Sequence, residues 1–380
     1  MPQDFSRRQF LATAGVAAAA LSLPAAIRAA TAEAKTWPGY AKSIVVDASG
    51  VPGDNDGDDA DMSLKPGELA DLKRSGLTVL NLTVSAVGSY ANDFEQTLKN
   101  IGHWDEQIAA HPEALLKWRS AADTQRAKES GRVAVMYAFQ DCTPFGENLD
   151  RFEMFHNLGV RVIQLTYNRR NLMGDGCLEP GNAGLSLLGK QLVERMNEKR
   201  VIVDLSHCGQ RTTREGIELS KQPVAITHTG CAAVSDLPRN KRDEELRLVA
   251  ERGGVVGIYF MPYLRTVGQP MAVDVIKHLE HALDVCGEDH VGIGTDGLSS
   301  PVKLDPKYRE DLKKEMAERR KMGIAAPGER DDAVTFVPDL NTAQRMETLA
   351  GLLSQRGHSD ARIEKILGGN FARLFHDVIG

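Results

Sequence analysis

The chain has 380 residues, of which 42% are hydrophobic and 26% are charged, and its formal net charge is −6. This composition is ordinary for a globular protein and supplies enough apolar residues for a large core. The charges are spread along the chain, which excludes the clustered basic face of a nucleic-acid-binding protein. The length allows two or three domains, although α/β barrels routinely use it as one.

Residues 1–34 have the features of an export signal. Arg7 and Arg8 precede an apolar stretch (11–27), and small residues follow. This order of a positive, an apolar and a small-residue segment defines a signal peptide, and the arginine pair resembles a twin-arginine signal. We therefore expect export to the periplasm. The alternative is an uncleaved membrane anchor, but the apolar stretch is short for a membrane span, and no later segment reaches about 18 apolar residues.

From residue 43 onward, runs rich in Val, Ile and Leu alternate with stretches of helical apolar spacing such as 185–199. Eight runs are typical of buried parallel strands. They are SIVVDA (43–48), LTVLNLTV (77–84), RVAVMYAF (132–139), RVIQLTY (161–167), RVIVDLSH (200–207), PVAITH (223–228), GVVGIYF (254–260) and HVGIGTD (290–296). Eight strand–helix units predict an α/β fold of the (β/α)8 TIM-barrel type, with residues 35–380 as one domain. A doubly wound open sheet is the alternative, but ASGVPG (48–53) lacks its G-x-G-x-x-G phosphate turn.

Polar residues end six of these predicted strands, where a barrel builds its active site. They are Asp47, Gln140, Tyr167, His207, His228 and Asp296. His207 and His228 end successive strands, so we expect their imidazoles to share one space. With Asp296 they form the pattern of a zinc site, in which the carboxylate is a ligand or a base. Each histidine alone is better explained as a structural residue, but the three strand ends together favour a metal site.

The order and spacing of six segments resemble the membrane dipeptidase (renal dipeptidase) family of zinc peptidases, from about residue 43 to the C-terminus. The segments are GVRVIQLTYNRRN (159–171), GLSLLGKQLVERMN (184–197), VIVDLSHCG (201–209), PVAITHTG (223–230), VGIGTDG (291–297) and ILGGNFARLF (366–375). The resemblance implies a (β/α)8 barrel that hydrolyses dipeptides with two zinc ions, bridged by a glutamate and a water or hydroxide. Because family members often dimerise, it also implies a homodimer, which no feature of the sequence supports.

Four positions match the functional residues of that family. His207 and His228 stand where two histidines hold one zinc ion, so the resemblance implies that they bind metal. Arg239, in LPRN (237–240), matches the arginine that orients the substrate. Asp296 matches the aspartate that is assigned a proton-transfer role, and we expect it to act as the base.

Four other positions depart from the family pattern. Ser49 and Val51 stand where a histidine and an aspartate would bind the other zinc, and Gln140 replaces the bridging glutamate. Valine cannot bind metal, serine is a poor zinc ligand, and glutamine bridges two cations badly because it is neutral. We therefore expect one zinc ion on His207 and His228, with Gln140 or Asp296 and water completing its coordination.

Tyr167 replaces the family's histidine that contacts the reacting carbonyl. Its hydroxyl could donate a hydrogen bond to a developing oxyanion and so serve in both binding and catalysis. A packing aromatic at the barrel mouth is the equally good alternative.

Other polar residues are candidates to replace the lost ligands. Aspartates in DNDGDDAD (54–61) lie on the loop after the first strand, although a solvated loop is the simpler interpretation. Asp141 follows Gln140 but faces the other way if the strand continues. Cys208 and Cys231 lie near the histidines, and small packing residues are the simpler interpretation for both. The five cysteines form no disulfide framework, although an oxidising periplasm permits one bridge.

The leading functional hypothesis is an exported metal-dependent hydrolase that cleaves a dipeptide or related small amide. The alternative is a catalytically inactive relative that binds a small carboxylate ligand through Arg239, or a partner protein. Altered chemistry on another exported small molecule is a third hypothesis, which the signal permits but does not indicate.

Overall fold

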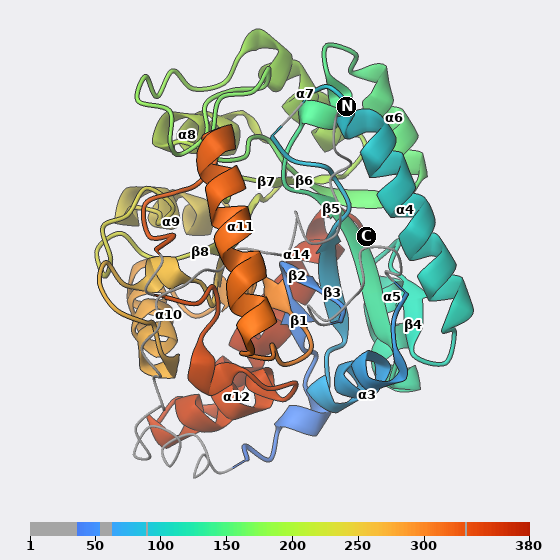
Figure 1. Ribbon diagram of the computed structural model, residues 1–380, viewed down its shortest axis with the longest axis vertical. Helices are drawn as coiled ribbons and strands as arrows, with labels where there is room; N and C mark the ends of the chain where they lie inside the picture. Colours follow the sequence, from blue (N-terminus) through green and yellow to red (C-terminus); the bar gives the residue numbers. More distant parts are fainter. Residues whose placement is uncertain (1–35, 54–62, 89, 331–332) are drawn as a thin grey trace.

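The computed structural model describes residues 36–53, 63–88, 90–330 and 333–380. Within these residues, parallel strands follow one another in the order β1-β3-β5-β6-β7-β8-β9-β10 around a barrel (Figure 1). Their bounds are β1 Val46–Asp47, β3 Val79–Thr83, β5 Val133–Phe139, β6 Val160–Gln164, β7 Ile202–Asp204, β8 Ala225–Thr229, β9 Val255–Ile258 and β10 Val291–Ile293. The backbone N–H of Ala48 donates to the carbonyl of Ile293 at 3.0 Å and joins the first strand to the last. The predicted barrel and its eight strands are confirmed.

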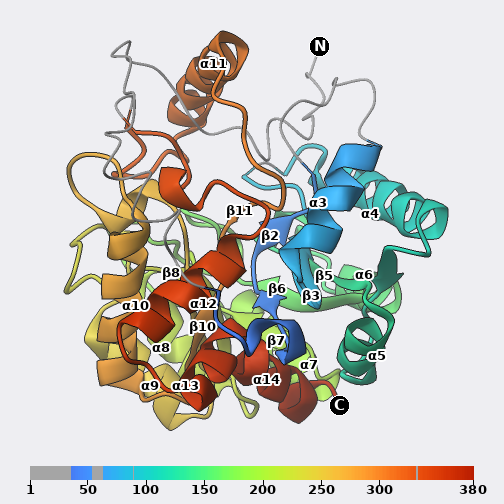
Figure 2. The same cartoon turned by 90° about the horizontal axis from the view of Figure 1, so that it is seen from below.

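Most of the helices surround the barrel on its outside, and one of them, α11, lies beyond one of its ends (Figures 1 and 2). Their bounds are α3 Pro66–Ser75, α4 Asp93–Ala110, α5 Ala122–Ser130, α6 Asp150–Asn157, α7 Leu187–Glu198, α8 Gln210–Leu219, α9 Asp243–Glu251, α10 Ala272–Cys286, α11 Pro306–Met322, α12 Arg345–Gln355, α13 Asp360–Glu364 and α14 Asn370–Val378. Helix α7 fits the helical spacing of 185–199. Among the described residues, none of these helices combines the length and apolarity needed to cross a bilayer.

Three short strands were not predicted. β4 (Leu115–Lys117) adds to β5, and β2 (Gly50–Val51) pairs with β11 (Gly297–Leu298) as a separate parallel ribbon. Next to this ribbon, the backbone N–H of Asp296 donates to the carbonyl of Ser49 at 2.7 Å. The ribbon therefore holds the chain after β1 against the chain after β10.

Three strands end three residues earlier than predicted, and this moves their site residues onto loops. These strands are β6, which ends at Gln164, β7, which ends at Asp204, and β10, which ends at Ile293. Tyr167, His207 and Asp296 therefore lie three residues beyond their strands, and the prediction that they end strands was wrong. At β7 the reason is a side chain: the Asp204 carboxylate accepts the backbone N–H of Ser206 at 3.1 Å, which turns the chain out of the sheet.

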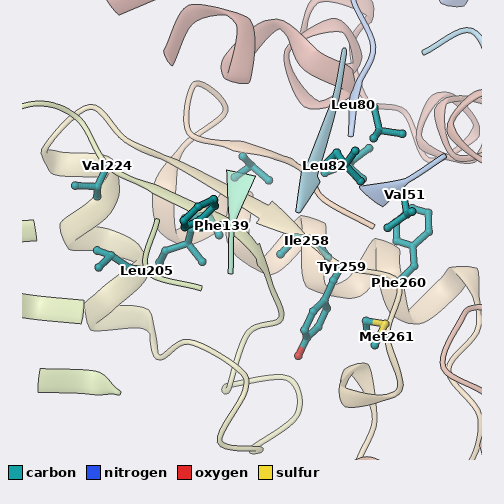
Figure 3. Packing of buried hydrophobic residues seen from close by; sticks show 14 of the residues in the cluster. Val51, Leu80, Leu82, Phe139, Leu205, Val224, Ile258, Tyr259, Phe260 and Met261 are labelled. Carbon is teal, nitrogen blue, oxygen red and sulfur yellow. The ribbon is translucent and has the colours of Figure 1, made fainter. Parts of the chain in front are cut away.

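The apolar core has two layers, because alternate residues of a barrel strand face opposite sides. Ala134 and Met136 of β5 belong to a cluster that includes residues of α14. Val135 and Tyr137, between and after them, belong to the larger cluster that includes residues of the surrounding helices. Figure 3 shows part of this larger cluster, which also contains Val51.

Candidate active site

A pair of histidines lies at the C-terminal end of the barrel. His228 belongs to β8 and His207 follows β7, and both are buried. Their Nε2 atoms face each other at 2.9 Å. The structure thus brings together the two residues predicted to share a metal ion.

Neighbouring side chains fix the outer nitrogen of each ring. The Asn168 amide nitrogen donates to the carbonyl of Ile324 at 2.8 Å, which turns its Oδ1 toward His207 Nδ1, 2.6 Å away. On the other ring, Nδ1 of His228 lies 2.8 Å from the Thr227 hydroxyl.

The Thr227 hydroxyl donates to Asp204 Oδ2 at 2.6 Å, so it accepts the Nδ1–H of His228. Asn168 Oδ1 likewise accepts the Nδ1–H of His207. Both Nε2 atoms therefore carry lone pairs, and these lone pairs point toward each other.

Electrostatics keep both imidazoles neutral. Burial and the nearby Arg239 guanidinium hold the pKa values of His207 and His228 well below their usual range. Two neutral rings with opposed lone pairs repel each other, and a cation bound by both Nε2 atoms removes that repulsion. An outer nitrogen held by a hydrogen-bond acceptor is also the usual arrangement of a metal-binding histidine. The histidine pair therefore fits one metal ion.

The opposite side of the barrel mouth does not fit a second ion. The Gln140 amide nitrogen donates to Ser49 Oγ at 3.2 Å and to Asp296 Oδ1 at 3.3 Å. Val51 is buried in the apolar core. Across the described ranges, no group of three or more His, Cys, Asp or Glu side chains is arranged to hold a metal ion.

Gln140 lies in the site, but its amide nitrogen rather than its oxygen meets the neighbouring carboxylate. Its predicted role as a metal ligand stays a prediction, since metal binding by Gln140 would require the amide to turn.

Asp296 lies next to Gln140 and Ser49 in a constrained conformation. Its φ of 56° is uncommon for a residue other than glycine, and such residues cluster at functional sites. Burial raises the pKa of Asp296 to about 6, although Arg239 acts in the opposite direction. Its carboxyl group is therefore poised to exchange a proton close to neutral pH.

Arg239 is a buried guanidinium with free hydrogen-bonding capacity. It is 1% exposed, and its Nη1 donates to the carbonyl of Ser206 at 2.7 Å. Its Nε and Nη2 have no hydrogen-bond partner among the described residues. Unpaired buried donors on an arginine are well suited to a carboxylate, which takes two parallel hydrogen bonds.

Tyr167 stacks on His207, with ring centroids 4.2 Å apart and an interplanar angle of 23°. Its hydroxyl lies 3.4 Å from both Nη atoms of Arg319 on α11. The structure thus places Tyr167 beside the histidine pair. Arg319 was missed by the sequence reasoning, because it belongs to no recognised motif and only the packing of α11 brings it here.

The cysteines contribute no ligands in this arrangement. All five are free, so the one disulfide that the periplasm would permit is not formed. The Cys208 thiol accepts from the Thr166 hydroxyl at 3.3 Å, and the Cys231 thiol contacts the carbonyl of His278 at 3.4 Å. The acidic stretch 54–61 lies outside the described residues.

Residues 68–327 match the family described as membrane dipeptidase (Peptidase family M19). The chain belongs to this family. Members of this membrane dipeptidase family are zinc metallopeptidases. Residues 4–24 match the signal sequence of the twin-arginine translocation pathway, which supports the predicted export.

Curated relatives of this chain include two fungal dipeptidases. Dipeptidase verJ from Clonostachys rogersoniana is 30% identical over 284 residues, which cover 74% of this chain and 65% of the relative. Dipeptidase tcpJ from Claviceps purpurea is 26% identical over 262 residues, which cover 68% of this chain and 54% of the relative. The chain therefore spans less than two thirds of the length of these two relatives.

Two solved structures show the same architecture. An amidohydrolase from Pseudomonas aeruginosa is 31% identical, with a TM-score of 0.77, covering 92% of this chain and 99% of that one. A metallo peptidase from Rhodobacter sphaeroides, liganded with a phosphinate mimic of the dipeptide L-Ala-D-Ala, gives a TM-score of 0.71 over 88% of this chain and 99% of that one. At 20% identity, the second likeness shows the fold alone.

Proposed function

We propose that this chain is an exported hydrolase that cleaves a dipeptide or a related small amide and depends on one zinc ion. The opposed lone pairs of His207 and His228 carry the proposal, because they need a cation. A zinc ion held there would supply a Lewis acid and would lower the pKa of water to about 7. The residues after 34 would form one barrel domain.

The substrate would be held by its carboxylate. Arg239 offers Nε and Nη2 for two parallel hydrogen bonds, and the Tyr259 and Tyr263 rings flank its guanidinium at 5.7 and 5.8 Å. Burial strengthens such a charge-assisted pair, since water does not compete for it. This arrangement favours a small substrate with a free carboxylate.

Proton transfer would fall to Asp296. As water adds to the amide carbon, the carboxylate would accept the released proton and then give it to the leaving amine. Gln140 and Ser49 both donate to Asp296 Oδ1, which orients the carboxylate. The Tyr167 hydroxyl would donate to the carbonyl oxygen as negative charge develops on it.

The alternative is an inactive barrel that binds a small carboxylate ligand or a partner protein. The hydrogen bonds among Gln140, Ser49 and Asp296 favour it, because they close the side of the mouth where the family holds its other metal. Arg239 would still bind a carboxylate.

One experiment separates the two functions. Purified protein is given zero, one or two equivalents of zinc and a panel of dipeptides, and both amino-acid release and thermal stability are measured. The proposed hydrolase releases amino acids once one equivalent is present. Stabilisation by dipeptide without zinc and without release would favour the inactive barrel.

A further inference from the structure

Helix α11 and the segment that follows it lie over the barrel mouth. The helix begins after Asp305, whose carboxylate accepts the backbone N–H of Tyr308, and it ends at Met322, just before Gly323. Figure 1 shows α11 in front of the strands, and Figure 2 shows it beyond the end of the barrel that carries β2 and β11.

The C-terminal end of α11 is tied to the loop that carries Tyr167. The Asn168 amide donates to the carbonyl of Ile324 at 2.8 Å, and the Arg169 guanidinium donates to the carbonyl of Met322 at 2.7 Å. These hydrogen bonds therefore hold the C-terminal end of α11 in a fixed position beside the candidate site.

A buried ion pair fixes the Arg319 side chain near this helix end. Its Nε and Nη2 donate to Glu329 at 3.0 and 2.7 Å, and the two side chains are 12% and 1% exposed. Glu329 is fixed in turn, because its Oε1 accepts from the Tyr263 hydroxyl at 2.6 Å. A guanidinium held along one edge keeps its remaining N–H groups in a set direction.

That direction is toward Tyr167. The Tyr167 hydroxyl lies 3.4 Å from Nη1 and from Nη2, a distance at which hydrogen bonds are weak. The Nη1 donors of Arg319 thus keep capacity for a stronger acceptor. Because the Tyr167 ring stacks on His207, this capacity lies beside the histidine pair.

We propose that Arg319 is a further active-site residue, which binds the carbonyl oxygen of the scissile amide together with Tyr167. When water adds to the carbonyl carbon, the π electron pair of the C=O bond moves onto this oxygen, while the proton of the water goes to Asp296. The Tyr167 O–H and the Arg319 Nη1–H then donate to the negatively charged oxygen. A positive charge from α11 would thus stand in for the charge lost with the second metal site. This inference rests on the proposed function.

The test compares variants of the zinc-loaded protein. Arg319→Gln is expected to lower kcat roughly 10²–10³-fold, the effect of losing one oxyanion donor, with a much smaller change in KM. It is also expected to weaken the binding of a phosphinate mimic of L-Ala-D-Ala, measured by calorimetry. Arg319→Lys, which keeps the charge and a partner for Glu329, should lie between wild type and Arg319→Gln. Arg320→Gln, at an exposed position of the same helix, is the matched control and should behave as wild type.

Tyr167→Phe gives an independent check that leaves α11 in place. It should lower kcat as well, and in combination with Arg319→Gln the losses should fall short of the product of the two single effects. If the Arg319→Gln variant has the same kcat and the same phosphinate affinity as the wild-type protein, the inference is overturned and the proposed function is unaffected. An unchanged kcat in Tyr167→Phe also overturns it.

Hydrolysis and phosphinate binding by the wild-type protein distinguish failure of the proposed function from failure of the role of Arg319. Wild-type protein that binds the phosphinate without hydrolysing dipeptides, and whose binding is weakened by Arg319→Gln, overturns the proposed function but supports Arg319 as the anion-binding residue. Wild-type protein that neither binds the phosphinate nor hydrolyses dipeptides overturns the proposed function and the role of Arg319 together.

Discussion

Two sides of the barrel mouth, the β7–β8 edge and the β1–β10 edge, are supported by the same hydrogen-bond arrangement. They differ in the side chains that this arrangement presents to the site. After β7, the Asp204 carboxylate accepts the N–H of Ser206 at 3.1 Å and the hydroxyl of Thr227 at 2.6 Å. After β1, the Asp47 carboxylate accepts the N–H of Ser49 at 3.3 Å and the hydroxyl of Thr295 at 2.6 Å. In each case an aspartate at a strand end joins its own loop to a threonine of the neighbouring strand or of the loop that follows it.

The β7–β8 edge uses this scaffold to present His207 and His228. The β1–β10 edge presents Ser49 and Asp296, which Gln140 joins by hydrogen bonds. The comparison teaches that the two sides have the same backbone support and differ in the side chains that this support presents.

Removing a ligand from the intact edge should have the largest effect. His207→Ala takes away one of the two nitrogens that we propose as metal ligands, so zinc should be lost and turnover should fall to background. The decrease in turnover should exceed the roughly 10–100-fold decrease that follows removal of a residue that only hydrogen-bonds a metal ligand. Zinc content and dipeptide hydrolysis are the measurements. His376→Ala, at an exposed position on α14, is the control, and retained zinc and turnover in His207→Ala would contradict the metal site.

Restoring ligands to the altered edge should add one zinc ion. The triple substitution Ser49→His, Val51→Asp and Gln140→Glu supplies a nitrogen and two carboxylates on a scaffold that is still in place. We expect a second equivalent by elemental analysis, at some cost in stability because Val51 packs in the apolar core. Gln140→Glu alone is the control and should keep one equivalent. A folded triple variant that binds only one zinc ion per chain would show that the β1–β10 edge cannot support a metal site as the β7–β8 edge does.

The two threonine hydroxyls provide a matched comparison of the edges. Thr227→Val removes the acceptor of the His228 Nδ1–H and should weaken zinc binding roughly 10–100-fold. Thr295→Val removes the corresponding hydroxyl beside Asp47 and should leave zinc affinity unchanged. Competition with a chromophoric chelator measures both, and equal losses would rule out the assignment of the metal to one edge.

The last comparison concerns the pH dependence of the free energy of unfolding at the β1–β10 edge. Burial raises the pKa of Asp47 to about 6, against hydrogen bonds from Thr295 that lower it. The folded state therefore binds its proton more tightly than the unfolded chain, where the value is 3.8. The stabilisation from this group is complete below pH 3.8 and is lost as the pH rises to about 6.

The loss amounts to about 3 kcal/mol at most, since each pKa unit corresponds to about 1.4 kcal/mol. Urea unfolding of wild type and Asp47→Asn between pH 4 and 7 measures it. The stability of wild type relative to the variant should decline over this interval, and a constant difference would refute the assignment.

The sequence was sufficient for the eight strands, because parallel barrel strands are short continuous apolar runs that alternate with stretches of helical apolar spacing. It failed at strand ends such as Asp204, where a side chain takes the backbone N–H that would extend the ladder. The histidine pair was predictable because His207 and His228 end two neighbouring predicted strands. Arg319 was not, because its contact with Tyr167 depends on how α11 packs over the mouth. That packing is set by distant contacts and leaves no local pattern.

The zinc content of protein purified from the periplasm tests the central claim most directly. The intact β7–β8 edge and the altered β1–β10 edge together predict one equivalent per chain, and the His207→Ala protein should contain none. Two equivalents in the wild-type protein would contradict the account of the altered edge. Folded wild-type protein without metal, and without gain of metal when zinc is supplied, would contradict the account of the histidine pair.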